Sequence, residues 1–322
     1  MHGLTINQDG SAEMAFTGSR DAVWHGLGAE LEKGASIETW REAAGMDWLV
    51  KSTPVMVNNG GDEPIRFPGK KALYRSDNQQ PLSIVGDKYH IVQPGEVLEF
   101  FRDLTDIHGF ELSTAGTLFG GRRFWALAET GKSFNISEGD EILGHLLLVT
   151  SVDGSLSTQA KFVSTRVVCN NTLTVSLNEH TRHLVRVSHK TKFDAEKVKI
   201  DLGIIDRSWS TFRDNLTKLA NTKVDQADAG CILRGAMFKK DVELDRQGYK
   251  VIKQYNAIIE KISNGIGSEE TRGTLFGVLN GATEVLTHAS RRKDESRKFI
   301  DSYEGELDQM KTRIYEHLLE AA

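Results

Sequence analysis

Basic, aromatic and amide residues recur through the middle of the chain in a pattern that suits binding to a nucleic-acid backbone. The segment GGRRFW sets two arginines beside a tryptophan, and further cations and two asparagines follow it. Arginine binds phosphates through paired hydrogen bonds, asparagine contacts base edges or phosphates, and an aromatic ring stacks on bases. The candidate nucleic-acid-binding residues are therefore Arg122, Arg123, Trp125, Lys161, Arg166, Asn170, Asn171, Arg182, Arg186 and Lys190.

The charge distribution supports the same interpretation. The chain has a net charge of −5, yet residues 181–240 hold 13 basic and 7 acidic residues. A block of this kind forms a local positive patch on an acidic protein. In a strand, Arg123 and Trp125 share one face and Arg122 lies on the other. A solvated helix face, or ordinary surface charge beside a core tryptophan, is the alternative interpretation.

The stretch VVCNNTL is the most motif-like part of the chain. Its apolar residues have spacings compatible with one face of a helix, which leaves Asn170 and Asn171 on a more polar side. We predict that these two asparagines mark a functional surface beside Arg166. Cys169, flanked by valines, is interpreted as a buried structural cysteine.

The patterns of the common catalytic and metal sites do not occur. There is no H-E-x-x-H, no G-x-x-x-x-G-K-[ST] and no G-x-S-x-G. His180 and His183 have no cysteine partner nearby, and Cys169 and Cys231 lie 62 residues apart. We therefore predict no metal, no cofactor and no catalytic residue, and an enzyme is not the leading interpretation.

The first half of the chain reads as strands. Residues 46–57, 71–76, 82–92, 110–129 and 141–165 are rich in strand-forming residues, with turn signals at Asp77-Asn78, Gly120-Gly121 and Asp153-Gly154. One helix is expected over 94–107, starting after Pro94.

The second half reads as helices. Apolar residues recur at steps of three and four from Asp194 to Leu219, and further helices are expected over 241–263, 269–287 and 296–321. The predicted fold class is α+β, with a mostly antiparallel sheet over residues 46–165 and helices after 166. Residues 1–222 are predicted to form an α+β core domain and residues 223–322 a helical region that serves oligomerisation or partner binding.

Composition narrows the class of protein. Of 322 residues, 39% are hydrophobic and 26% are charged, which is typical of a soluble globular chain. The first residues do not resemble a secretory signal, and the apolar runs are shorter than a membrane span requires. Two cysteines fit a reducing compartment. We expect no membrane association and a location in the cytoplasm of a bacterial host.

Several phrases resemble a known family. WHGLG, AAGMDWLV, ALYRSDNQQPLSIVGDKYHIVQ, TAGTLFGGRRFWALAE and STRVVCNNTL occur in order over roughly residues 20–220. They resemble the phage/plasmid-like family of domains of unknown function, which implies a mobile-element setting and no particular activity. The layout is also similar, in architecture only, to phage annealing recombinases of the RecT and Red-beta type.

These observations lead to a functional expectation. We expect a phage or mobile-element protein that binds single-stranded DNA, of annealing or recombination type, and forms a homo-oligomer. One alternative is an interaction protein that inhibits or remodels a host complex through its helical region. Another is an enzyme that acts on nucleic acid.

Overall fold

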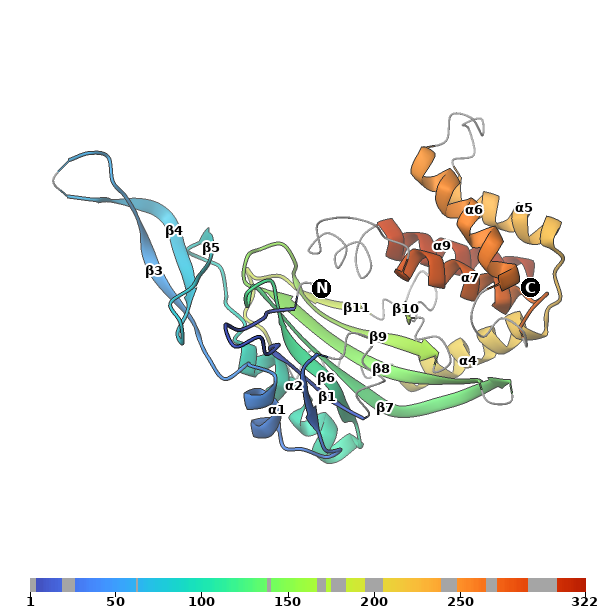
Figure 1. Ribbon diagram of the computed structural model, residues 1–322, viewed down its shortest axis with the longest axis horizontal. Helices are drawn as coiled ribbons and strands as arrows, with labels where there is room; N and C mark the ends of the chain where they lie inside the picture. The colour runs from blue at the N-terminus through green and yellow to red at the C-terminus, as the bar shows by residue number, and fades with distance from the viewer. Residues whose placement is uncertain are drawn as a thin grey trace. The chain divides into compact units, whose positions relative to one another are not determined.

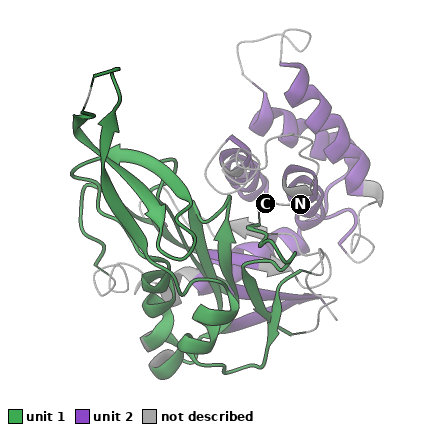
Figure 2. Ribbon diagram, turned by 60° about the vertical axis from the view of Figure 1, so that its left-hand side comes forward, with its two compact units in different colours: residues 1–131, 145–161, 184–203 green, residues 132–144, 162–183, 204–322 purple. Residues whose placement is uncertain are grey.

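The structure is a computed structural model that describes residues 4–18, 27–61, 63–137, 140–166, 172–174, 184–194, 205–238, 248–264, 271–288 and 306–322. The chain divides into two compact units (Figure 2). Unit 1 comprises residues 1–131, 145–161 and 184–203, and unit 2 comprises residues 132–144, 162–183 and 204–322. The chain passes from one unit to the other after residues 131, 144, 161, 183 and 203.

The larger sheet has eight strands in the order β10-β9-β8-β7-β6-β1-β2, with β11 also paired to β9. Its strands are β1 (Met14–Thr17), β2 (Ala29–Leu31), β6 (Glu111–Leu118), β7 (Arg123–Ser137), β8 (Asp140–Ser151), β9 (Thr158–Arg166), β10 (Thr172–Thr174) and β11 (Leu184–Val187). Strand β1 pairs antiparallel with β6 and parallel with β2. Both β10 and β11 are antiparallel to β9.

A separate three-stranded sheet belongs wholly to unit 1, and we call it the arm. It consists of β3 (Val50–Val57), β4 (Ile65–Arg75) and β5 (Pro81–Gly86) in the order β3-β4-β5, with antiparallel pairing throughout. Figure 1 shows the arm extending away from β1 and β6 of the same unit.

Local capping interactions determine where the two described helices of unit 1 begin. Helix α1 (Ile37–Ala43) begins after Ser36, whose side chain accepts the Thr39 N–H. Helix α2 (Pro94–His108) begins with Pro94 behind a capping box formed by Gln93 and Glu96. These helices bury large apolar side chains: Trp40, Leu98, Phe100 and Phe101.

Unit 2 gathers the remaining helices: α4 (Ile205–Asn221), α5 (Gln226–Met237), α6 (Tyr249–Asn264), α7 (Leu275–His288) and α9 (Glu306–Ala321). An aromatic cluster packs within it, in which Phe134 of β7 contacts Trp209 and Phe212, and Phe212 contacts Tyr315. In α7 a Cβ on Gly277 would lie 2.4 Å from the Thr271 carbonyl oxygen, so close packing requires glycine there.

The α+β prediction is confirmed, as are the helix after Pro94 and the hairpin at Gly120-Gly121. The predicted helical spacing of VVCNNTL is wrong at residues 172–174, because these pair with β9 as a strand. Strands β10 and β11 also lie after residue 166. Residues 195–204, at the start of the predicted helix, lie outside the described residues. The division at residue 222 stays a prediction.

The described helices contain no segment that is long and apolar enough to span a bilayer.

Candidate nucleic-acid interface

The structure describes the side chains of six of the ten sequence-predicted residues, and these six lie in different environments. Arg122, Arg186 and Lys190 are exposed, and Trp125 is half-buried. Arg123 and Lys161 are each only 1% exposed. Arg166 ends β9, and its side chain lies outside what the structure describes, as do the residues Asn170, Asn171 and Arg182.

Burial of Arg123 and Lys161 corrects the expectation that they line an open groove. Nη2 of Arg123 donates a hydrogen bond to Oγ of Ser155 at 2.8 Å, and its guanidinium carbon lies 5.2 Å from the centre of the Phe119 ring. Alternation along a strand indicates which residues share a face, but it does not indicate which face the rest of the protein covers. Arg123 and Lys161 are therefore not available to a ligand at the protein's surface, whereas the exposed cations are.

Trp125 packs on its own sheet. It lies opposite Gly116 in the β6–β7 pair, and a Cβ on Gly116 would lie 2.5 Å from the tryptophan ring. Its Nε1 lies 3.4 Å from Oγ1 of Thr114. The ring thus covers the strand at a position where β6 has no side chain.

The turn between β8 and β9, residues 152–157, brings together three segments that are distant in sequence. The Val152 N–H donates to the Arg122 carbonyl at 2.9 Å, and Ser155 accepts from Arg123. A ring nitrogen of His189, Nε2, lies 2.9 Å from the Leu156 carbonyl oxygen. The turn therefore places Arg122 and the His189-Lys190 segment beside the same loop, at one end of the unit 1 strands.

The root of the arm is attached to this same end. Ser83 of β5 donates to the Val152 carbonyl, and the Tyr89 hydroxyl donates to the Ser151 carbonyl at 2.9 Å. The rings of Tyr89 and His189 stack with their centres 4.4 Å apart. Burial raises the pKa of the Tyr89 hydroxyl, which favours the neutral donor that this hydrogen bond requires.

A buried ion pair joins the arm to the larger sheet. Arg75 of β4 donates to both carboxylate oxygens of Glu13, at 2.7 and 3.0 Å, and also binds Asp77. Its guanidinium carbon lies 4.0 Å from the centre of the Trp48 ring. Arg75 and Glu13 are 3% and 4% exposed, and Thr117 donates to the same Glu13 carboxylate.

Arg75 and Asp77 stabilise each other's charged forms. Burial opposes ionisation of Asp77, but hydrogen bonds and the charge of Arg75 outweigh burial and hold the pKa of that carboxyl below its usual value. Burial likewise opposes the charge of Arg75, and the two carboxylates outweigh it and raise the pKa of the guanidinium. The charged groups of this cluster are paired with one another, so the cluster serves to hold the arm to the larger sheet rather than to bind a ligand.

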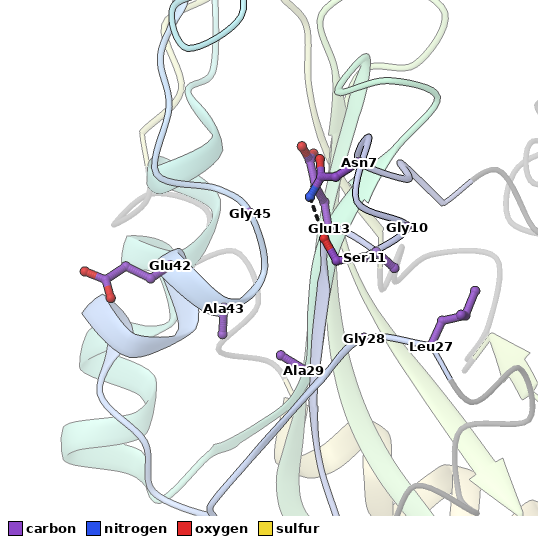
Figure 3. Close-up of a pocket in the computed structure, with 11 residues that line it drawn as sticks. Asn7, Gly10, Ser11, Glu13, Leu27, Gly28, Ala29, Glu42, Ala43 and Gly45 are labelled. Atoms are coloured by element: carbon purple, nitrogen blue, oxygen red, sulfur yellow. Dashed lines mark hydrogen bonds between the residues drawn. The ribbon is translucent and has the colours of Figure 1, made fainter.

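Glu13 also lines a pocket of about 450 Å³, and Figure 3 shows the residues around it. Asn7 donates to Ser11 there, and Gly28 faces the backbone of Met14 so closely that a Cβ would lie 2.8 Å from its carbonyl oxygen. The close approach of the Met14 backbone, next to the Ala15–Ala29 pair of β1 and β2, accounts for the glycine at position 28. The Glu13 carboxylate in its wall is occupied by Arg75 and Thr117.

The arm adds cations that the sequence interpretation missed. Lys51, Arg66 and Lys70 are exposed on it, and Phe67 is 46% exposed between the last two. The local signal was the run IRFPGKK, an aromatic residue enclosed by three cations. Whether these residues can bind a ligand depends on their exposure, which the alternation of residues along a strand does not determine.

Within the described residues, no three histidine, cysteine, aspartate or glutamate side chains lie close enough to hold a metal ion. A family model described as "Domain of unknown function (DUF932)" matches residues 81–304, which is more than half of the chain. The chain belongs to the DUF932 family. Searches of curated proteins and of solved structures found no match.

The DUF932 match begins at Pro81, the first residue of β5. It therefore covers the β8–β9 turn, Arg122, Arg186 and Lys190, whereas β3 and β4 of the arm precede it. The sequence resemblance to a family of domains of unknown function agrees with this result.

Proposed function

We propose that this DUF932 protein binds single-stranded DNA through the end of unit 1 that surrounds the β8–β9 turn. One observation carries the proposal: exposed cations that are far apart in sequence lie beside this turn and on the arm whose root is attached to it. Such a surface can follow a phosphate backbone without reading sequence.

The finer parts of the proposal rest on the sequence. An annealing or recombination role, a homo-oligomeric state, a phage or plasmid setting and a cytoplasmic location follow from the family-like phrases and the strand-then-helix layout. Light scattering of the purified protein, alone and with an oligonucleotide, tests the oligomeric state.

The test compares two triple variants that remove the same charge. Arg122→Gln/Arg186→Gln/Lys190→Gln removes the exposed cations beside the β8–β9 turn and that of Arg186, which lies in β11 opposite Gln159 of β9. Lys218→Gln/Lys223→Gln/Lys253→Gln removes three exposed lysines from unit 2. Each variant is titrated against a fluorescent (dT)30 by anisotropy, in EDTA, at several salt concentrations.

Counterion release gives the expected result. The slope of log K against log salt is about −0.7 for each phosphate neutralised on a single strand. The first variant should lose about 2 from the magnitude of the slope, and the second should keep the wild-type slope. Equal losses in both variants would mean that net charge, rather than this surface, governs binding.

A further inference from the structure

The arm presents one face whose side chains are apolar and open to solvent. Val57 lies opposite Ile65 in the β3–β4 pair, and Phe67 follows Ile65 by two residues, which puts it on the same side of the strand. Thr53, on the Val57 side of β3, lies opposite Ala72, which in turn lies opposite Ile84 of β5. We call this surface, formed by Val57, Ile65, Phe67 and Ile84, the arm face.

The exposure of the arm face is unusually high for such side chains. Ile84 is 61% exposed, Ile65 56%, Phe67 46% and Val57 43%. On the other side of the arm, Leu73 and Val85 near its root are buried, and Met56 near its tip is 52% exposed. Contiguous apolar exposure on a soluble protein marks a binding surface more often than chance.

Two lysines lie on the same side as the arm face. Lys51 is opposite Tyr74 and two residues before Thr53, and Lys70 is opposite Gly86 and two residues before Ala72. Both are exposed, and Tyr74 is half-exposed. The face therefore combines an aromatic and aliphatic surface with positive charge, which is suited to a ligand that is both flat and anionic.

Features of the arm argue against its pairing with a second copy of the chain. The edge strand β3 carries Pro54 and Lys51, and its register with β4 shifts near Pro54. Proline, lysine and irregular pairing all discourage addition of another strand at an edge. Packing two arm faces together would also bring the lysines of both copies into one apolar interface, where like charges repel.

We infer that the arm face binds the unpaired bases of a nucleic-acid single strand, with Lys51 and Lys70 taking the adjacent phosphates. This inference rests on the proposed function and specifies how the strand is held. Base faces are accessible only when bases are unpaired, so the arm face discriminates a single strand from a duplex. Stacking tolerates every base, so binding is largely independent of sequence.

The test removes the Phe67 ring and the bases of the ligand, separately and together, and compares the four binding affinities. Wild type and Phe67→Ala are each titrated with (dT)30 and with an abasic 30-mer that retains its phosphates. Phe67→Ala should weaken binding to (dT)30 roughly 5- to 150-fold with an unchanged salt slope. It should leave binding to the abasic strand unaltered.

Two further variants control for fold and for loss of an aromatic ring. Tyr249→Ala removes a tyrosine of α6 that is 79% exposed, and it should bind (dT)30 like the wild type. Phe67→Trp should restore binding and show tryptophan emission that (dT)30 quenches beyond the wild-type level. Thermal melts should be unchanged in Phe67→Ala, because the replaced ring is half-exposed.

The outcomes separate the inference from the proposed function. If wild type binds (dT)30 with a steep salt dependence and Phe67→Ala binds equally well, the inference is wrong and the proposed function stands. If wild type binds no oligonucleotide at low salt, the proposed function fails and the inference fails with it. A wild-type oligomer that Phe67→Ala dissociates would assign the arm face to a second copy and overturn the inference.

Discussion

Replacing Arg75 by methionine should destabilise the protein at the joint between the arm and the larger sheet, because the change leaves the Glu13 carboxylate buried without its main partner. Glu13 is 4% exposed and would keep only the Thr117 hydroxyl as a donor among the contacts that now hold it. Breaking a buried ion pair from one side destabilises a protein by about 3–5 kcal/mol. Methionine retains an apolar contact with the Trp48 ring, so the loss comes mainly from the uncompensated charge.

The magnitude is measured with a double-mutant cycle. Urea unfolding of wild type, Arg75→Met, Glu13→Gln and the double variant gives the coupling between the two side chains. The double variant should be more stable than the sum of the single changes predicts, by about 2 kcal/mol or more, since it buries no unpaired charge. An Arg75→Met protein within about 1 kcal/mol of wild type would refute the assignment of this pair as a joint.

Four other changes have defined outcomes. Asp77→Asn should destabilise the protein near neutral pH, because the lowered pKa of Asp77 means that its side chain stabilises the fold only while it is ionised. The difference in unfolding free energy from wild type should shrink as pH falls below about 4. Unfolding measured at pH 7 and at pH 3 checks this. His189→Phe keeps the stack on Tyr89 but loses the contacts with the Leu156 and His90 carbonyls, so thermal melts should show a loss of about 1–2 kcal/mol. Trp125→Ala uncovers Gly116 and should lower the free energy of unfolding by up to about 3 kcal/mol, which thermal melts measure. The slope of log K against log salt for oligonucleotide binding, measured by anisotropy, should stay unchanged. Replacing Asn170 and Asn171 by alanine should weaken oligonucleotide binding and leave the melting temperature nearly unaltered; a large loss of stability with normal binding would place them in the core.

Local signals in the sequence predicted the parts of the fold that local interactions determine. Pro94 and the residues around it predicted the start of α2, and Gly120-Gly121 predicted the turn of the β6–β7 hairpin, where both glycines adopt positive φ. Pairing between β1 and β6 joins residues about a hundred positions apart, and no short-range sequence pattern predicts this pairing. The short helix α1 also escaped notice, because seven residues give too little periodicity.

The candidate interface was only partly predictable for the same reason. Arg122, Arg186 and Lys190 are exposed, whereas Arg123 and Lys161 are buried. A strand pattern assigns residues to two faces, and tertiary packing decides which face is covered. The arm cations and Phe67 were missed because their importance comes from their exposure, which the sequence pattern does not reveal.

The most direct test of the central claim is the salt dependence of binding for the wild-type protein, with single-stranded (dT)30 and a 30-base-pair duplex measured side by side. With three to six phosphates contacted at the β8–β9 turn and the arm, log K for the single strand should fall with log salt at a slope of roughly −2 to −4. At each salt concentration the single strand should bind more tightly than the duplex. Salt-independent binding, or equal affinity for the duplex, would contradict the account.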